Sequence, residues 1–262
     1  MMNEKEVKVN EPVDMEMQNE IAMVKEYDWN DLPEHFMVVL CGMRRCGKGI
    51  LTNTILHTIH EERQWDVVFL FSETSAVQVD AWEYIPKRFK YDKVDTDIIE
   101  KIIKRQQDII DNKKTPPNVL LILDDCVHGS GMRYGKSGDI INKLACAGRH
   151  YKISCICLFQ KLVGAVLPKF RSNCDVMVFF RQPSRSQREF IVDSYLSIKN
   201  TNKKDYIYEF LDGLFGGEEY VVLVIVVSDA QKSFNLHEFC YKFKAPEKVP
   251  EFYIGNPMYY RQ

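Results

Sequence analysis

Seven consecutive residues near the start of the chain have the types and spacing of a phosphate-binding loop. The segment Gly42-Met43-Arg44-Arg45-Cys46-Gly47-Lys48 follows an apolar run ending at Cys41 and precedes a stretch with helical spacing. Glycines let backbone N–H groups converge on phosphates, the helix N-terminus adds its positive dipole end, and the lysine places a charge beside the β- and γ-oxygens. The segment, extended to Gly49 and Ile50, therefore predicts ATP binding. A loop in which the glycines only shape a turn is the alternative.

Position 49 departs from the usual pattern of such loops. Gly49 stands where a serine or threonine hydroxyl normally coordinates Mg²⁺, so the metal site loses one ligand. Thr52 and Thr54 lie nearby, but neither occupies the normal position. Slow or absent hydrolysis therefore stays open. Arg44 and Arg45 are expected to reach the γ-phosphate or a neighbouring subunit's nucleotide, with solvated surface charge as the alternative.

Two carboxylates follow a second apolar run. Val119–Leu123 leads directly into Asp124 and Asp125. Ligands bind at the carboxyl ends of the strands in open α/β sheets. We therefore expect Asp124 to hold Mg²⁺, directly or through water, and Asp125 to polarise the attacking water. A solvated turn would explain Asp125 but not the strand that precedes it.

Two further basic segments suit contact with nucleic acid. The segment 128–138 is glycine-rich and places Tyr134 between Arg133 and Lys136, a composition that suits phosphate-backbone contact. A flexible connector is the alternative. A cluster of arginines after the fifth apolar run could contact DNA or a neighbouring subunit, or form a solvated helix face. Its members are Arg181, Arg185 and Arg188.

The elements that must position these residues follow one pattern. Non-alternating apolar runs, rich in Val, Ile and Phe, predict strands buried on both faces of a parallel sheet. They cover residues 36–41, 67–71, 119–123, 153–159, 176–180 and 221–227. Segments with helical spacing separate most of them, at residues 50–62, 98–112, 137–149 and 184–198. This alternation predicts a three-layer, doubly wound, mainly parallel α/β sheet. The glycine-containing segment 211–219 predicts a turn.

Composition narrows the class of protein further. The chain has 262 residues, of which 45% are hydrophobic, and one α/β domain over residues 36–262 accounts for it after an acidic arm at 1–35. No apolar run approaches the ~20 residues of a membrane-spanning helix, and the acidic start is unlike a signal peptide. The net charge of -2 argues against a uniformly basic nucleic-acid coat. Scattered cysteines without a Cys-x-x-Cys pair indicate a reducing compartment and no structural zinc.

The order of motifs after the acidic strand resembles a known family. A helix ends in Gly148-Arg149-His150, the run Ile153–Phe159 is capped by Gln160, and the segment 167–175 follows with Arg171 and Asn173. This series is similar to the genome-packaging ATPases of large DNA viruses and virophages, a branch of the FtsK/HerA-type translocases. The resemblance covers residues 36–227, and its most specific part is residues 149–173. It implies a P-loop NTPase with a RecA/FtsK-like core.

The resemblance also assigns roles to two residues. In that family a glutamine at the end of the strand after the acidic motif senses the γ-phosphate, which matches Gln160. A buried polar cap is the alternative. Arg149 matches the family's arginine-histidine pair and would sense nucleotide or act across a subunit boundary, as arginine fingers do. A helix C-terminal cation, favoured by the helix dipole, is its alternative.

The family further implies an activity, partners and a location. The implied activity is that of a homo-oligomeric ring that moves double-stranded DNA into a capsid. The implied partner is a capsid or portal-vertex protein, and the implied location is the virion or a viral assembly site in the host cytoplasm. Asn202-Lys203-Lys204-Asp205 matches the guanine-recognition pattern of GTPases by letter, but no buried strand precedes it and no Asp-x-x-Gly occurs. A small-molecule kinase would need a lid and an acceptor pocket that no segment clearly supplies. The remaining alternative is a nucleotide-binding scaffold or assembly protein with weak or absent hydrolysis, indicated by Gly49.

Overall fold

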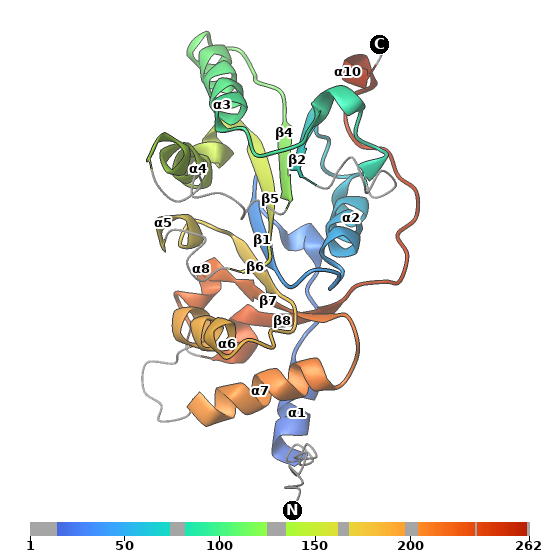
Figure 1. The fold of residues 1–262 in the computed structure, drawn as a ribbon, viewed down its shortest axis with the longest axis vertical. Coiled ribbons are helices and arrows are strands. Elements are labelled where there is room, and N and C mark those ends of the chain that lie inside the picture. The colour runs from blue at the N-terminus through green and yellow to red at the C-terminus, as the bar shows by residue number, and fades with distance from the viewer. Residues whose placement is uncertain are drawn as a thin grey trace, which may run out of the picture.

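The core of the protein is an eight-stranded sheet with the order β3-β2-β4-β5-β1-β6-β7-β8 (Figure 1). The computed structural model describes residues 15–73, 82–124, 135–161, 168–196, 204–233 and 235–260. The strands are β1 (Met37–Cys41), β2 (Val67–Ser72), β3 (Lys90–Tyr91), β4 (Val119–Asp124), β5 (Ile153–Phe159), β6 (Val176–Phe179), β7 (Val221–Val226) and β8 (Cys240–Lys244). Among the strands of the described residues, only β7 runs against the others, since it pairs antiparallel with both β6 and β8.

Strand β1 occupies the middle of the sheet because every one of its side chains is apolar and buried. It pairs in parallel with β5 on one side and β6 on the other, and Cys41 stands opposite both Phe159 and Phe179. The carboxyl ends of these three strands are therefore level. The six runs predicted as strands are confirmed, whereas the short β3 and the edge strand β8 gave no comparable apolar signal.

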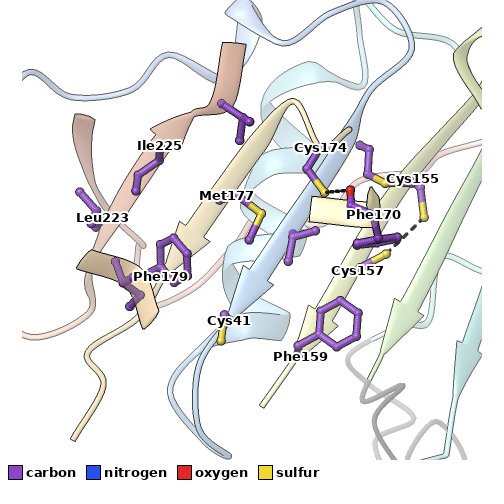
Figure 2. Close-up of a cluster of buried hydrophobic side chains, with 14 of the residues drawn as sticks. Cys41, Cys155, Cys157, Phe159, Phe170, Cys174, Met177, Phe179, Leu223 and Ile225 are labelled. Carbon is purple, nitrogen blue, oxygen red and sulfur yellow. Dashed lines mark hydrogen bonds between the residues drawn. The ribbon is translucent and has the colours of Figure 1, made fainter. Parts of the chain in front are cut away.

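Side chains of each strand alternate between two separate apolar cores. Val39 and Cys41 face one core, while Val38 and Leu40 face the other. Figure 2 shows part of the first core, where sulfur and aromatic groups of β1, β5 and β6 pack together. The Sγ atoms of Cys155 and Cys157 lie 3.5 Å apart there.

Helices cover both faces of the sheet (Figure 1). The α-helices are α1 (Met15–Met23), α2 (Lys48–Ile59), α3 (Thr96–Asp111), α4 (Gly135–Ala147), α5 (Pro168–Arg171), α6 (Arg185–Ile191), α7 (Lys204–Gly216), α8 (Val227–Ala230), α9 (Leu236–Phe239) and α10 (Pro257–Tyr260). Shorter helical turns are η1 (Trp29–Asp31), η3 (Lys87–Phe89), η5 (Gly148–Tyr151) and η6 (Val192–Leu196). Leu51, Ile55 and Ile59 of α2 pack on one face, and the apolar sides of α3, α4 and α7 pack on the other. The predicted three-layer α/β arrangement is confirmed.

The segment before β1 packs on the domain from Met15 onward. Trp29 is only 2% exposed, and it joins Tyr27 and Leu32 in the core that contains α2. The Tyr27 N–H donates to the Lys242 carbonyl at 2.9 Å, so this segment covers the free edge of β8. An acidic arm ending at residue 35 does not describe this packing, because buried aromatic side chains anchor the segment. Residues 1–14 lie outside the described ranges.

Helix α7 extends further than the sequence predicts. The segment 211–219 was expected to form a turn, but helix α7 continues to Gly216, because Leu211 and Leu214 are buried against the sheet. Gly213 is tolerated inside the helix at a cost of about 1 kcal/mol. Helix α7 then leads into the reversed strand β7. Among the helices of the described ranges, none combines the length and apolar character that a bilayer crossing requires.

Candidate nucleotide-binding site

The base of the phosphate loop is pinned between two strands. The Gly42 N–H donates to the Phe159 carbonyl of β5 at 3.0 Å. The Phe180 N–H, just after β6, donates to the Cys41 carbonyl at 2.9 Å. These bonds continue the sheet ladder past the end of β1, so the loop leaves the sheet at a fixed position.

Gln182 supports this exit point, although no motif in the sequence indicates it. Its side chain is 5% exposed, and Nε2 donates to the carbonyls of Cys41 at 3.1 Å and of Phe180 at 3.0 Å. The Cys41 carbonyl therefore keeps two partners where the strand becomes loop. No motif surrounds Gln182 in the sequence, and its partner Cys41 lies 141 positions away.

Two glycines of the loop are required for different reasons. A β-carbon on Gly42 would lie 2.5 Å from Cys46 Sγ and 2.7 Å from Phe180 Cβ, which is too close for any side chain. Gly47 has φ 98°, in the left-handed region that glycine adopts without steric cost. Arg45 also has a positive φ, 61°, which an arginine adopts only at some cost in free energy. The loop backbone is therefore held in a conformation that its own sequence only partly favours.

The start of α2 is arranged as an anion site. No side chain caps the helix at Gly47, and its first turn contains no acidic residue. The first N–H groups and the positive end of the helix dipole are thus directed at the loop. Lys48 Nζ donates to the carbonyls of Gly42 and Met43, both at 2.7 Å, which holds the ammonium within the loop.

The charge of the loop is positive at neutral pH. Burial raises the pKa of the Cys46 thiol, although the adjacent Lys48 ammonium opposes that effect. The thiol therefore stays protonated and adds no negative charge beside Lys48. With Arg44 and Arg45, the loop carries three cationic side chains and no anionic one.

Most of the residues predicted for the site line one cleft of about 870 Å³. Lys48, Asp124 and Gln160 all line it, although they come from three separate parts of the sequence. Its lining also includes Arg44, Arg45, Gly47, Gly49 and Ile50 from the loop and the start of α2. No motif in the sequence indicates the rest of the lining, which consists of Asn53, Trp82, Glu219, Tyr220, Ala245, Pro246 and Glu247.

Asp124 ends β4, and Ser72 ends the adjacent strand β2. The two residues stand opposite each other in the sheet, and Ser72 Oγ donates to Asp124 Oδ2 at 2.8 Å. Ser72 is 1% exposed, so this bond fixes the orientation of the half-buried carboxylate. Neither a motif nor an apolar pattern in the sequence identified Ser72 as a partner of Asp124.

The side chains of the cleft supply only part of a usual Mg²⁺ site. Mg²⁺ is usually bound by one or two carboxylates together with phosphate oxygens and water, and Asp124 in the same cleft as Lys48 suits that arrangement. Gly49 supplies no hydroxyl. Thr52 Oγ1 donates to the Lys48 carbonyl and Thr54 Oγ1 to the Ile50 carbonyl, both at 2.9 Å, so these hydroxyls bond within their own helix. A hydroxyl ligand is thus missing at position 49.

Some of the predicted residues lie outside the described ranges. Asp125 and residues 126–134 of the glycine-rich segment belong to this group. The predicted role of Asp125 therefore stays a prediction. Of the arginine cluster, Arg185 pairs with Glu189 at 2.7 Å and Arg188 with Asp212 at 2.8 Å, which suits the solvated helix face weighed above.

Arg149 lies at the opposite edge of the sheet from the cleft. It belongs to η5, which precedes β5, whereas Gln160 follows β5. The seven residues of β5 separate the two by about 20 Å. Arg149 is exposed and lines a smaller pocket of about 170 Å³ with Asn173 and Asp175. Within one chain, the length of β5 therefore separates this arginine from the edge that carries the phosphate loop.

Comparison with known proteins decides the family. The model of the Poxvirus A32 protein family matches residues 24–250. The chain belongs to the Poxvirus A32 protein family. The resemblance to viral genome-packaging ATPases is thereby confirmed, and the match starts within the segment that was expected to be a separate arm.

Individual relatives and solved structures resemble the chain over much of its length. The chain is 27% identical to the uncharacterized protein 075L of invertebrate iridescent virus 6 over 165 residues, 63% of this chain and 60% of that protein. The fold resembles that of the genome packaging NTPase B204 of Sulfolobus turreted icosahedral virus 2 in complex with AMPPCP, with a TM-score of 0.56, 15% identity and coverage of 82% and 100%. It also resembles the pCW3 conjugation coupling protein TcpA, with a TM-score of 0.53, 10% identity and coverage of 81% and 60%. These likenesses show the fold, which the chain shares with a packaging NTPase and a conjugation coupling protein.

The steric difference between two glycines gives a testable prediction for this family member. Gly42→Ala is expected to lower the free energy of unfolding by about 1–3 kcal/mol, since its β-carbon overlaps Cys46 and Phe180. Gly49→Ala is the matched control, because a β-carbon there meets nothing within 4 Å and alanine favours the helix. Chemical denaturation of both variants measures the difference. Equal stabilities would show that the loop is not packed as described.

Proposed function

We propose that this protein is an ATP-driven translocase that packages double-stranded viral DNA into a capsid. The observation that carries the proposal is the cleft in which Lys48, Asp124 and Gln160 meet at the start of α2. Membership of the Poxvirus A32 protein family supports it, as does the likeness in fold to a genome packaging NTPase with a bound ATP analogue.

Lys48 and Gln160 of the cleft, together with the predicted base Asp125, suit hydrolysis of the γ-phosphate. In the proposed reaction a water oxygen bonds to the γ-phosphorus while the bond to the β–γ bridging oxygen breaks, and Asp125 accepts the water's proton. Lys48 and the N–H groups of the loop stabilise the charge that develops on the phosphate oxygens. Gln160 orients the water through its side-chain amide. Mg²⁺, held by Asp124, would neutralise further charge on the β- and γ-oxygens.

Arg149 enters the proposal through a neighbouring subunit. Its position at the far edge of the sheet suits a ring in which that edge of one subunit faces the cleft of the next. A head-to-tail interface of this kind closes into a ring when the rotation between subunits allows it. The ring would surround double-stranded DNA and dock on a capsid or portal-vertex protein, at the viral assembly site in the host cytoplasm or in the virion.

Gly49 favours a second candidate function, a nucleotide-binding scaffold or assembly protein with weak or absent hydrolysis. The two are separated by measuring phosphate release from ATP with and without double-stranded DNA, for the natural chain and for Gly49→Ser. The position has room for the serine side chain, since a β-carbon there meets nothing within 4 Å. We expect measurable hydrolysis by the natural chain that DNA stimulates. The restored hydroxyl ligand is expected to leave that rate unchanged or higher.

The opposite pattern of rates would support the scaffold. If the natural chain releases no phosphate and Gly49→Ser does, the motor assignment fails for this chain in isolation. The added hydroxyl would then have restored a metal ligand that the natural chain lacks.

A further inference from the structure

The cleft extends beyond the residues that a triphosphate requires. In the sheet order, β4 with Asp124 lies two strands from β1 on one side, and β7 lies two strands from β1 on the other. Neighbouring strands are about 4.8 Å apart, so the cleft extends about 10 Å to each side of the phosphate loop. The part beside β7 and β8 has no role in the proposed hydrolysis.

The reversed direction of β7 places an aromatic residue in that part. Because β7 runs antiparallel, its first residues lie at the edge where the parallel strands end. Tyr220 immediately precedes β7, and Ala245 and Pro246 immediately follow β8 at the same edge. All three line the cleft together with Gly47.

Tyr220 lies against the phosphate loop and remains accessible. Its Cδ1 atom is 3.7 Å from the position that a β-carbon on Gly47 would occupy. The residue is nevertheless 52% exposed, so the tyrosine is not part of the core. Its φ of 63° is unfavourable for a tyrosine, and its carbonyl accepts the Ala245 N–H at 3.4 Å. Strained residues of this kind concentrate at ligand sites, where surrounding structure holds them.

The charges along the cleft indicate which part of a nucleotide lies where. Arg44, Arg45 and Lys48 line the region of the phosphate loop. Glu219 and Glu247 line the region of β7 and β8, and carboxylates there would repel phosphate groups. The same carboxylates accept hydrogen bonds from hydroxyl and amino groups, which ribose and nucleobases carry. The polarity therefore matches a nucleoside triphosphate with its sugar and base towards β7.

We propose that Tyr220 is the platform on which the base of the bound nucleotide stacks, with Pro246 beside it. This inference rests on the proposed function, since it assumes that the triphosphate occupies the loop at Lys48. The platform binds the base of ATP through its aromatic face and so adds affinity that an inorganic triphosphate does not gain.

The test compares two ligands that differ by the nucleoside. Dissociation constants are measured by calorimetry for ATP and for inorganic tripolyphosphate, with the natural chain, Tyr220→Phe and Tyr220→Ala. Stacking of one base on an aromatic ring corresponds to roughly a tenfold effect on affinity. Tyr220→Ala is expected to weaken ATP binding about tenfold and leave tripolyphosphate binding unchanged. Tyr220→Phe is expected to bind both ligands like the natural chain, because the ring is kept.

The outcomes separate this inference from the function on which it rests. If Tyr220→Ala binds ATP like the natural chain, or loses affinity for both ligands alike, the platform is wrong while the phosphate site stands. A loss that is shared by both ligands would mean that the ring only supports the loop. If the natural chain binds neither ligand, the nucleotide site and the platform are both overturned.

Discussion

Replacing Lys48 with alanine is expected to lower the rate of ATP hydrolysis by about a hundredfold or more. The ammonium lies inside the phosphate loop, where it donates to the carbonyls of Gly42 and Met43 at 2.7 Å. It is therefore positioned against the oxygens on which charge develops in the transition state. The measurement is steady-state phosphate release at saturating ATP.

A matched control separates this effect from the loss of one positive charge. Lys104 lies on the exposed side of α3 and is not one of the residues that line the cleft, so Lys104→Ala removes the same charge outside the site. Lys104→Ala is expected to hydrolyse ATP at the natural rate. A Lys48→Ala protein that is folded and turns over ATP normally would refute the placement of the site. Circular dichroism of both variants establishes that they are folded.

The chemistry-bearing loop and the central sheet could be predicted because their signals are local. The run before Gly42 is apolar at every position, and a strand buried on both faces needs no pattern beyond that. Glycines and a lysine at fixed spacing specify the loop in the same short window. The acidic residue Asp124 likewise directly follows its strand. A parallel sheet therefore places the carboxyl ends of β1, β4 and β5, and the residues that end or follow them, at one edge.

The supporting residues could not be predicted, because their partners are distant in sequence. Ser72 meets Asp124 across 52 positions, and Gln182 meets Cys41 across 141. Each is a single polar residue without a periodic pattern around it. Tyr220 depends on the reversal of β7, which no local feature of an apolar run specifies. The burial of Trp29 could not be predicted for the same reason. It lies in an acidic segment of the sequence, and its ring is buried only once the complete domain has folded.

Arg149 illustrates how a motif can be recognised while its site of action is not. The segment around it resembles packaging ATPases, yet the structure places it at the end of β5 opposite to Gln160. In its own chain it contributes to the surroundings of Asp175. Burial raises the pKa of that carboxyl, whereas the Met37 N–H and the Arg149 charge lower it. The arginine either supports Asp175 in its own chain or acts on a neighbour's nucleotide. These two roles predict different results for variants of Arg149.

Arg149→Ala is expected to slow ATP hydrolysis by the assembled protein about a thousandfold, as loss of an arginine finger does. The guanidinium of one subunit would neutralise charge on the γ-phosphate bound by the next. ATP affinity is expected to change little, because the Lys48 loop and the cleft of each subunit are intact. Arg149→Lys is the control for support of Asp175, since it keeps the positive charge but not the planar fork. A structural role predicts that lysine restores turnover, whereas action on the phosphate predicts that it does not.

Mixing two inactive variants distinguishes the roles directly. Lys48→Ala subunits keep Arg149, and Arg149→Ala subunits keep the phosphate loop, so one of the mixed interfaces contains both groups. Random pairing in a head-to-tail ring would make roughly one interface in four complete. A 1:1 mixture is therefore expected to recover hydrolysis that neither variant has alone. A mixture as inactive as its components would confine Arg149 to its own chain, because only a shared site can be rebuilt from two defective subunits.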